Sequence, residues 1–474
     1  MRFLAVLCFF CLGFSVSAQR EPVRLQVGFD GQIVTNRWNP LSLTLRDMPD
    51  ATLEITILQG SIREGEIPIR YVLPVEGRTG VQAVADDVFI PDWRGFSWAL
   101  RTDARVLASG SLDRRDSGAE PHAPLNLIVS ARPGTWLGSY PEDARTAAVA
   151  PGDLPTRLAA YDGVASIFID GSAPAPKAEA LLAAASAGAN VVLLEPLTSS
   201  HASLRQLAPE GGTRLGAGWL LLEDAAGLRR ALARESVDED ALLEALITED
   251  LRTQAPYQEA TPLILAAGLY TVISLLLLRL GGPAGLLTSL SVAAVTSFLA
   301  WSWLRPETER AELGRSLDVS AGGLSRRLEV RSLFSLPGGA VSLGERAVPA
   351  ERTAYTQTYR GLELDAPRWT GLELRLKPSL RTSALRWQDG VLINTGDGAL
   401  FDVYVFGLGP QPPLEPGASL VPSENEQVKL PEVYNRLLAH LPRGSALARS
   451  AGRLHAALPE TPIQASLGVP PVLP

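Results

Sequence analysis

The chain has almost no cysteine. Its 474 residues include two, Cys8 and Cys11, and both lie in an apolar stretch near the N-terminus. The rest of the sequence therefore lacks the thiols that disulfides, thiol catalysis and cysteine-based zinc sites require. Histidine is also scarce, with four residues in distant segments. We accordingly expect no metal site and no cofactor.

The chain also has fewer basic than acidic residues. The formal net charge is −8 and the isoelectric point is about 5.3. A nucleic-acid-binding protein normally has a basic face, so we do not expect this chain to bind nucleic acid. Charged residues make up 20% of the chain and the mean hydropathy is positive, which fits folded domains combined with membrane-spanning segments.

The first residues have the features of a secretory signal. Arg2 precedes a short apolar run, and Val16-Ser17-Ala18 is typical of a cleavage site. We expect residues 1–18 to be removed. The alternative is that this stretch is a first membrane helix, for which it is short.

Two long uncharged runs cover residues 262–278 and 283–304, separated by four residues that include Gly281 and Gly282. A bilayer core of about 30 Å requires roughly 20 apolar residues in a helix. Backbone groups in lipid must be hydrogen-bonded internally, which favours one helix for each run. We predict a transmembrane hairpin over 262–304, with both flanking parts of the chain on the same, extracytoplasmic side of the inner membrane.

Small residues recur every four positions on the second predicted span, at Gly285, Ser289, Ala293 and Ser297. Side chains of this size allow helices to approach closely. The stripe is expected to pack on the first helix of the hairpin, and a partner's helix is the alternative.

Residues 21–120 contain short runs in which apolar and polar residues alternate, broken by Gly, Asp and Pro. A period of two indicates strands with one buried face. About seven such strands in a hundred residues predict an immunoglobulin-like β-sandwich.

Residues 122–235 differ, because four continuous apolar runs alternate with helical stretches. The runs lie at 125–129, 164–169, 191–194 and 219–222. Continuous apolar strands are typical of parallel sheets covered on both faces. The pattern therefore predicts an α/β domain with right-handed crossovers.

Ligands of such sheets bind beyond the carboxyl ends of the strands. Asp170 and Glu195 follow two of the apolar runs, and His201 follows shortly after. These three residues are a candidate ligand edge. The structural alternative is that Thr198, Ser199 and Ser200 cap the next helix and that His201 lies in its first turn.

Several short segments carry a family resemblance: Leu154-Pro155, Tyr161-Asp162-Gly163, the apolar run 164–170, and residues 188–194 after a helix. They resemble class I glutamine-amidotransferase-like domains, in the degenerate form found in bacterial envelope proteins. In active members a nucleophilic cysteine follows the last strand, where this chain has Glu195-Pro196. The resemblance implies the fold without the amidotransferase activity.

The wider layout also resembles uncharacterised envelope membrane proteins, and Arg37-Trp38-Asn39-Pro40 is similar to the start of their first sandwich. Members are often encoded near MoxR-type ATPases and von Willebrand factor A-like proteins. The resemblance therefore implies the lipid bilayer and envelope proteins as partners.

The remaining segments complete the expected architecture. Residues 236–260 should form an acidic helical neck. Alternating strands predict a second β-sandwich over 311–425, with Asn394 stabilising a turn. Residues 429–474 are predicted to be a helical tail with two helices, the second at 445–458.

These observations favour a non-catalytic, membrane-anchored accessory or scaffold protein that binds envelope partners through its outward domains. One alternative is an auxiliary subunit of an ABC-type exporter. Another is a hydrolase that uses Asp170, Glu195 and His201.

Overall fold

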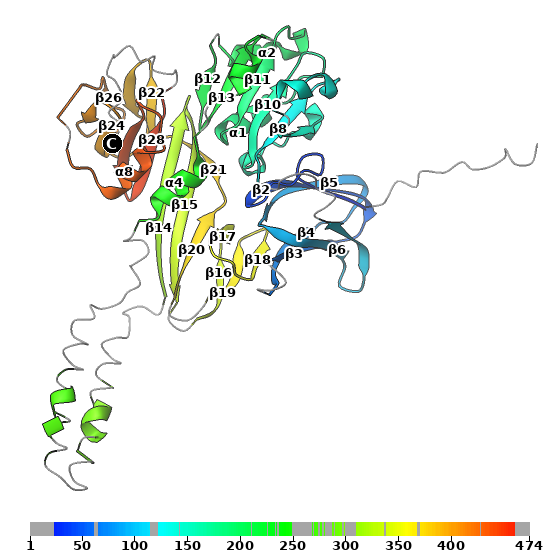
Figure 1. Cartoon of the computed structure of the whole chain (residues 1–474). Helices are drawn as coiled ribbons and strands as arrows, with labels where there is room; N and C mark the ends of the chain where they lie inside the picture. The colour runs from blue at the N-terminus through cyan, green and yellow to red at the C-terminus, as the bar shows by residue number, and fades with distance from the viewer. Residues whose placement is uncertain are drawn as a thin grey trace, which may run out of the picture.

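The structure is a computed structural model of the chain. It describes residues 23–60, 65–113, 122–141, 143–209, 211–224, 226–232, 234, 237–248, 310–335, 338–366, 370–426 and 428–459, together with scattered helical residues between 268 and 298. A β-sandwich and an α/β part lie next to each other, and two long strands run alongside them to a further β-rich part (Figure 1).

The N-terminal sandwich follows from the alternating sequence pattern. In β2, Leu41, Leu43 and Leu45 are at most 1% exposed, whereas the residues between them face outward. One sheet has the order β1-β2-β5, and strands β4, β3, β6 and β7 lie in a second sheet. Their bounds are β1 Val23–Val27, β2 Arg37–Met48, β3 Ala51–Gln59, β4 Ile67–Val75, β5 Arg78–Ile90, β6 Trp93–Arg101 and β7 Val106–Asp113.

Three strands of the second sheet come from the other half of the chain. They extend it in the order β16-β19-β18-β4, and β18 runs parallel to β4 with Tyr355 opposite Ile69. Leu362 and Leu364 are buried in the same core as Ile55. The strands predicted at 21–120 are present, and residues 339–366 complete their sandwich through β16 Gly339–Leu343, β18 Tyr355–Thr358 and β19 Leu362–Ala366.

The predicted α/β part is built on a sheet of order β12-β13-β11-β10-β8-β9, in which only β12 is antiparallel. The four apolar runs are its central strands, as expected. Its elements are β8 Leu125–Val129, β9 Arg145–Ala148, β10 Val164–Ile169, α1 Ala178–Ser186, β11 Asn190–Leu194, α2 Ala202–Leu207, β12 Thr213–Leu215, β13 Gly218–Glu223 and α3 Leu228–Leu232. Five short 3-10 helices lie at Pro133–Thr135, Leu137–Ser139, Pro151–Asp153, Leu158–Tyr161 and Ser199–His201.

The third part is built on the long hairpin of β14 and β15, whose twelve residues each pair along their whole length. A nine-stranded sheet includes this hairpin, and the three-stranded sheet β22-β23-β26 shares a core with β24, β27 and β28. The bounds are β14 Arg310–Ala321, β15 Leu324–Ser335, β17 Ala347–Pro349, β20 Thr370–Leu376, β21 Ser379–Thr382, β22 Leu385–Gln388, β23 Val391–Asn394, β24 Phe401–Val405, β25 Gly409–Pro410, β26 Ser419–Leu420, β27 Ala446–Ser450 and β28 Arg453–Ala457.

The prediction of a second helix in the C-terminal tail, at 445–458, is wrong. Residues 445–458 form the antiparallel pair β27–β28, and one helix, α8 (Glu432–Leu438), precedes them. Ala451 and Gly452 connect the strands with φ angles of 41° and 79°. Two consecutive positive φ angles are typical of a tight type I′ hairpin turn. The alanine-rich composition suggested a helix and concealed this turn.

The acidic neck contains one described helix, α4 (Glu239–Leu246), with Asp238 as its N-cap. Leu242, Leu243 and Leu246 are buried in a core shared with β14, β15 and α8. The helix therefore belongs to the third part of the molecule (Figure 1).

Most of the predicted membrane hairpin lies outside the described residues. This applies to Gly281, Gly285, Ser289 and Ser297, and also to the signal segment 1–18, whereas Ala293 is described as helical. In the part of the chain that is described, no helix has the length and apolar character needed to cross a bilayer.

Candidate functional site

The carboxyl edge of the parallel sheet brings Asp170 beside the loop that follows β8. Its carboxylate accepts hydrogen bonds from Ser130 Oγ at 2.6 Å, Trp136 Nε1 at 2.7 Å and the Ser172 backbone N–H at 3.0 Å. Burial alone would raise the pKa of Asp170, but the bonds from Ser130, Ser172 and Trp136 outweigh it and lower this pKa. Asp170 is thus an ionised carboxylate that organises the loops around it.

The other two residues of the predicted edge also have local partners. Glu195 forms an ion pair of 2.8 Å with Arg205 of α2. His201 is fully buried, and its Nδ1 lies 2.8 Å from Thr198 Oγ1 and 3.1 Å from Ser200 Oγ. Burial lowers the pKa of His201, against the opposing field of Asp170. The imidazole is therefore neutral at pH 7, and Thr198 and Ser200, two of the three residues expected to cap the helix, contact this ring.

No hydrogen bond or ion pair of the described chain joins any two of Asp170, Glu195 and His201. Direct proton transfer requires hydrogen-bond reach. The arrangement therefore supports loop organisation more directly than a proton relay. Within the described ranges, no group of three or more His, Cys, Asp or Glu side chains is placed to hold a metal ion.

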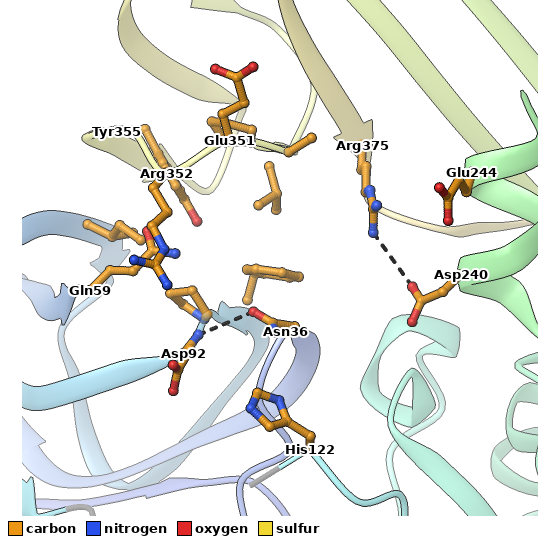
Figure 2. A pocket seen from close by; sticks show the side chains of 16 residues that line it. Asn36, Gln59, Asp92, His122, Asp240, Glu244, Glu351, Arg352, Tyr355 and Arg375 are labelled. Carbon is orange, nitrogen blue, oxygen red and sulfur yellow. Dashed lines mark hydrogen bonds and ion pairs between the residues drawn. The ribbon is translucent and has the colours of Figure 1, made fainter. Parts of the chain in front are cut away.

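A pocket of about 620 Å³ lies where the sandwich, α4 and the segment around β17 meet (Figure 2). Tyr355 points into it, and its buried hydroxyl has no hydrogen-bond partner in the described chain. Arg375 and Asp240 form an ion pair of 3.6 Å at one side of the pocket, and Asn36 accepts a 3.2 Å hydrogen bond from the Asp92 N–H. No local sequence signal indicates this pocket, because its walls come from segments hundreds of positions apart.

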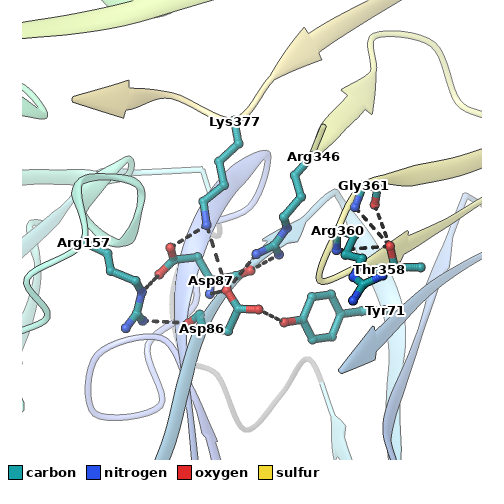
Figure 3. A network of polar contacts seen from close by, with 9 residues as sticks. All are labelled: Tyr71, Asp86, Asp87, Arg157, Arg346, Thr358, Arg360, Gly361 and Lys377. Carbon is teal, nitrogen blue, oxygen red and sulfur yellow. Dashed lines mark hydrogen bonds and ion pairs between the residues drawn. The ribbon is translucent and has the colours of Figure 1, made fainter. Parts of the chain in front are cut away.

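A second polar cluster joins all three parts of the molecule (Figure 3). Asp87 of β5 has a fully buried side chain, and it forms ion pairs with Arg157 at 3.0 Å and Lys377 at 2.8 Å. Its neighbour Asp86 pairs with Arg346 at 2.7 Å and accepts a hydrogen bond from the Tyr71 hydroxyl. Arg157 belongs to the α/β part, and Lys377 and Arg346 belong to the third part. The cluster therefore fixes the three parts against one another.

Two of the segments that carry the family resemblance, residues 37–40 and 161–163, meet where the sandwich contacts the α/β part. Asp162 accepts hydrogen bonds from the Trp38 backbone N–H at 3.0 Å and from Arg326 Nη2 at 2.8 Å. A Cβ on Gly163 would lie 2.7 Å from Val34 of the sandwich, so glycine is needed for this close approach. The Glu239 carboxyl of α4 also contacts Arg326, which is 2% exposed. In this structure Asp162, Gly163 and Trp38 take part in the packing of the parts against one another.

Comparison with known proteins leaves the chain without a family assignment. No family model matches it, and neither does any curated protein. Among solved structures, a Paenibacillus sp. cycloisomaltooligosaccharide glucanotransferase complexed with cycloisomaltoheptaose is similar over 36% of this chain and 27% of that chain, with 12% identity and a TM-score of 0.17. A likeness of this degree carries no conclusion about fold or function.

Proposed function

We propose that the chain is a membrane-anchored accessory protein of the bacterial envelope, whose folded body binds partner proteins. The signal segment and the uncharged runs of 262–304 motivate the anchor. In this proposal the body is extracytoplasmic, and the turn at Gly281-Gly282 faces the cytoplasm.

The observation that carries the proposal is the pairing of strands from both sides of the anchor. Strand β4 precedes residues 262–304 and β18 follows them, yet the two strands are hydrogen-bonded neighbours. Two segments of one sheet lie on the same side of a membrane. If the uncharged region crosses the membrane, it must return to that side, so the pairing supports an even number of crossings and fits a hairpin.

The buried charge clusters give this body a defined shape. Arg157, Lys377 and Arg346 reach Asp86 and Asp87 from two other parts of the molecule, and Arg326 links Asp162 with Glu239. Breaking such buried pairs is strongly destabilising. A rigid surface built from three parts suits a protein that presents a fixed arrangement to partners.

Photo-cross-linking in intact cells tests partner binding. A photoreactive side chain would be placed at Leu137, which is 51% exposed beside the Asp170 edge, or at Val421, which is 71% exposed in the third part. The same change at Val81, 64% exposed on β5, is the comparison. We expect a discrete adduct with an envelope protein from Leu137 or Val421 and none from Val81.

Adducts of equal yield from all three positions would indicate collisions without a specific partner, and an absence of adducts from all three would contradict the proposal. An adduct with an ATP-hydrolysing membrane complex would favour the alternative of an exporter subunit. Carbonate extraction checks the anchor separately: the chain should stay with the membranes, and its release would contradict the hairpin.

A further inference from the structure

We propose that a basic groove between the N-terminal sandwich and the third part of the molecule binds a ligand that carries several phosphate groups. The groove has a volume of about 670 Å³, which is within the usual range for small-molecule clefts. Its lining includes six arginines, one lysine and two glutamates on a chain whose net charge is −8. We define the basic groove by its cationic residues Arg327, Arg331, Arg346, Arg360, Lys377, Arg381 and Arg453.

Four of these cations already have acidic partners and form the wall of the groove. Arg327 forms two hydrogen bonds to Asp318, at 2.7 and 2.9 Å. Arg331 pairs with Glu329 at 2.6 Å. Arg346 and Lys377 belong to the Asp86–Asp87 cluster, and Figure 3 shows them reaching that cluster together. Their charge is largely neutralised, but they hold the groove in shape.

The other three cations have no acidic partner within the described chain. Arg360, Arg381 and Arg453 are all exposed, and Arg360 lies 4.9 Å from the ring of Tyr359. They come from three separate elements: the turn between β18 and β19, strand β21, and the first position of β28. Their convergence on one groove places three unneutralised guanidinium groups around a shared space.

The chemistry of these groups favours phosphate. Arginine presents a planar set of donors that matches phosphate oxygens in pairs, whereas lysine acts as a compact point charge. The hydroxyl-bearing residues Ser316 and Ser379 also line the groove and add neutral donors. Arg453 lies opposite Ser316 in the register of β28 and β14, so a donor of each kind is held on adjacent strands. The inference concerns the folded body and does not depend on the membrane anchor.

The direct test is calorimetric titration of the full-length chain in detergent micelles with tripolyphosphate. The site variant combines Arg360→Gln, Arg381→Gln and Arg453→Gln. The control variant combines Arg24→Gln, Arg46→Gln and Arg105→Gln, which removes the same charge from exposed arginines outside the groove. We expect the affinity of the site variant to be weaker by at least about tenfold and that of the control variant to be unchanged. Added salt should weaken binding by the wild-type chain.

Equal losses of tripolyphosphate affinity in the two variants would show a general charge effect and overturn the proposal. An absence of binding by the wild-type chain would also overturn it. If hexaglutamate bound as tightly as tripolyphosphate, the groove would recognise acidic peptides and not phosphate specifically, and the proposal would be overturned as well. Titration with a soluble short-chain phosphatidylinositol bisphosphate, a lipid that carries three phosphates, distinguishes the source: tighter binding than tripolyphosphate identifies a lipid headgroup, and weaker binding identifies a free polyphosphate. Matching thermal unfolding of both variants and the wild type excludes misfolding as the cause.

Discussion

Glu239 is a buried carboxyl group, and the stability of the protein should depend on its titration. Burial is the largest influence and raises the pKa of Glu239 to about 8, against the attraction of Arg326. In the unfolded chain this carboxyl has an ordinary pKa near 4.5. The folded state therefore keeps a proton that the unfolded state has released, and its stability falls as pH rises from about 4.5 to about 8.

Glu239→Gln should remove this pH dependence, because glutamine resembles the protonated acid. Relative to the wild type, the free energy of unfolding of the variant should increase with pH across that window, by up to about 1.4 kcal/mol per pH unit. Thermal melts of both chains over this range provide the measurement. A constant difference between the two melting temperatures would show that Glu239 does not titrate there.

Asp87 is the residue on which the three-part junction most depends. Asp87→Asn removes the charge that faces Arg157 and Lys377, and it leaves Lys377 with only the more distant Asp86, at 3.9 Å. We expect the free energy of unfolding to fall by about 3 kcal/mol, measured by denaturant titration. The exposed Asp103 is the matched control, and Asp103→Asn should change stability by no more than about 0.5 kcal/mol. Similar effects of the two changes would contradict a special role for Asp87.

At the scale of residues, sequence reasoning succeeded where the partner is local. Asn394 was predicted to stabilise a turn, and its side chain accepts from Gly396 N–H and donates to the Gly398 carbonyl. It failed where partners are distant: Arg326 and Asp162 are separated by 164 positions, and no spacing rule relates them. The candidate edge was found from strand ends, but the hydrogen bonds from Ser130 and Trp136 to Asp170 come from a distant segment and required coordinates.

The β27–β28 turn is an element whose sequence suits it poorly. Ala451 adopts a left-handed conformation with φ of 41°, which disfavours any residue that has a Cβ. Ala451→Asn should therefore raise the free energy of unfolding by about 0.5–1 kcal/mol, since asparagine is preferred in this turn type. Gly452→Ala should lower it by about 1 kcal/mol through backbone strain alone, because a Cβ there meets no atom within 4 Å. Thermal melts of the two variants provide the measurement. A destabilising Ala451→Asn or a stabilising Gly452→Ala would contradict the assigned turn.

Strand pairing across the chain gives a second prediction at this scale. Thr356 of β18 lies opposite Arg70 of β4, within the distance that a disulfide can bridge on adjacent strands. The double variant Arg70→Cys/Thr356→Cys should form a disulfide under oxidising conditions and migrate faster on a non-reducing gel. Arg70→Cys/Gly398→Cys is the control, because Gly398 lies between β23 and β24, outside the sheet that contains Arg70. Equal mobility of the two oxidised variants would contradict the pairing.

Element type was predictable where periodicity is strong. The alternating runs became strands such as β2, and the continuous runs became the parallel strands β10 and β11. Residues 445–458 show the converse case, because alanine and leucine favour a helix intrinsically and only the tertiary sheet favours strands there.

For the whole molecule, the order of domains along the sequence differs from their order in space. The sandwich begins at β1, yet β18 and β19 complete it after the chain has passed through the predicted anchor. A one-dimensional pattern identifies strands but not which distant strand each will join. The folded body is thus one interlocked unit built from both halves of the chain.

The central claim is that this body lies on one side of a membrane and the Gly281-Gly282 turn lies on the other. The scarcity of cysteine allows a direct measurement with single-cysteine variants and a membrane-impermeant thiol reagent on intact spheroplasts. Gly398 is exposed and has open space for a side chain, so Gly398→Cys should react. Gly282→Cys should react only after permeabilisation. Labelling of both variants in intact spheroplasts, or of neither, would contradict the account.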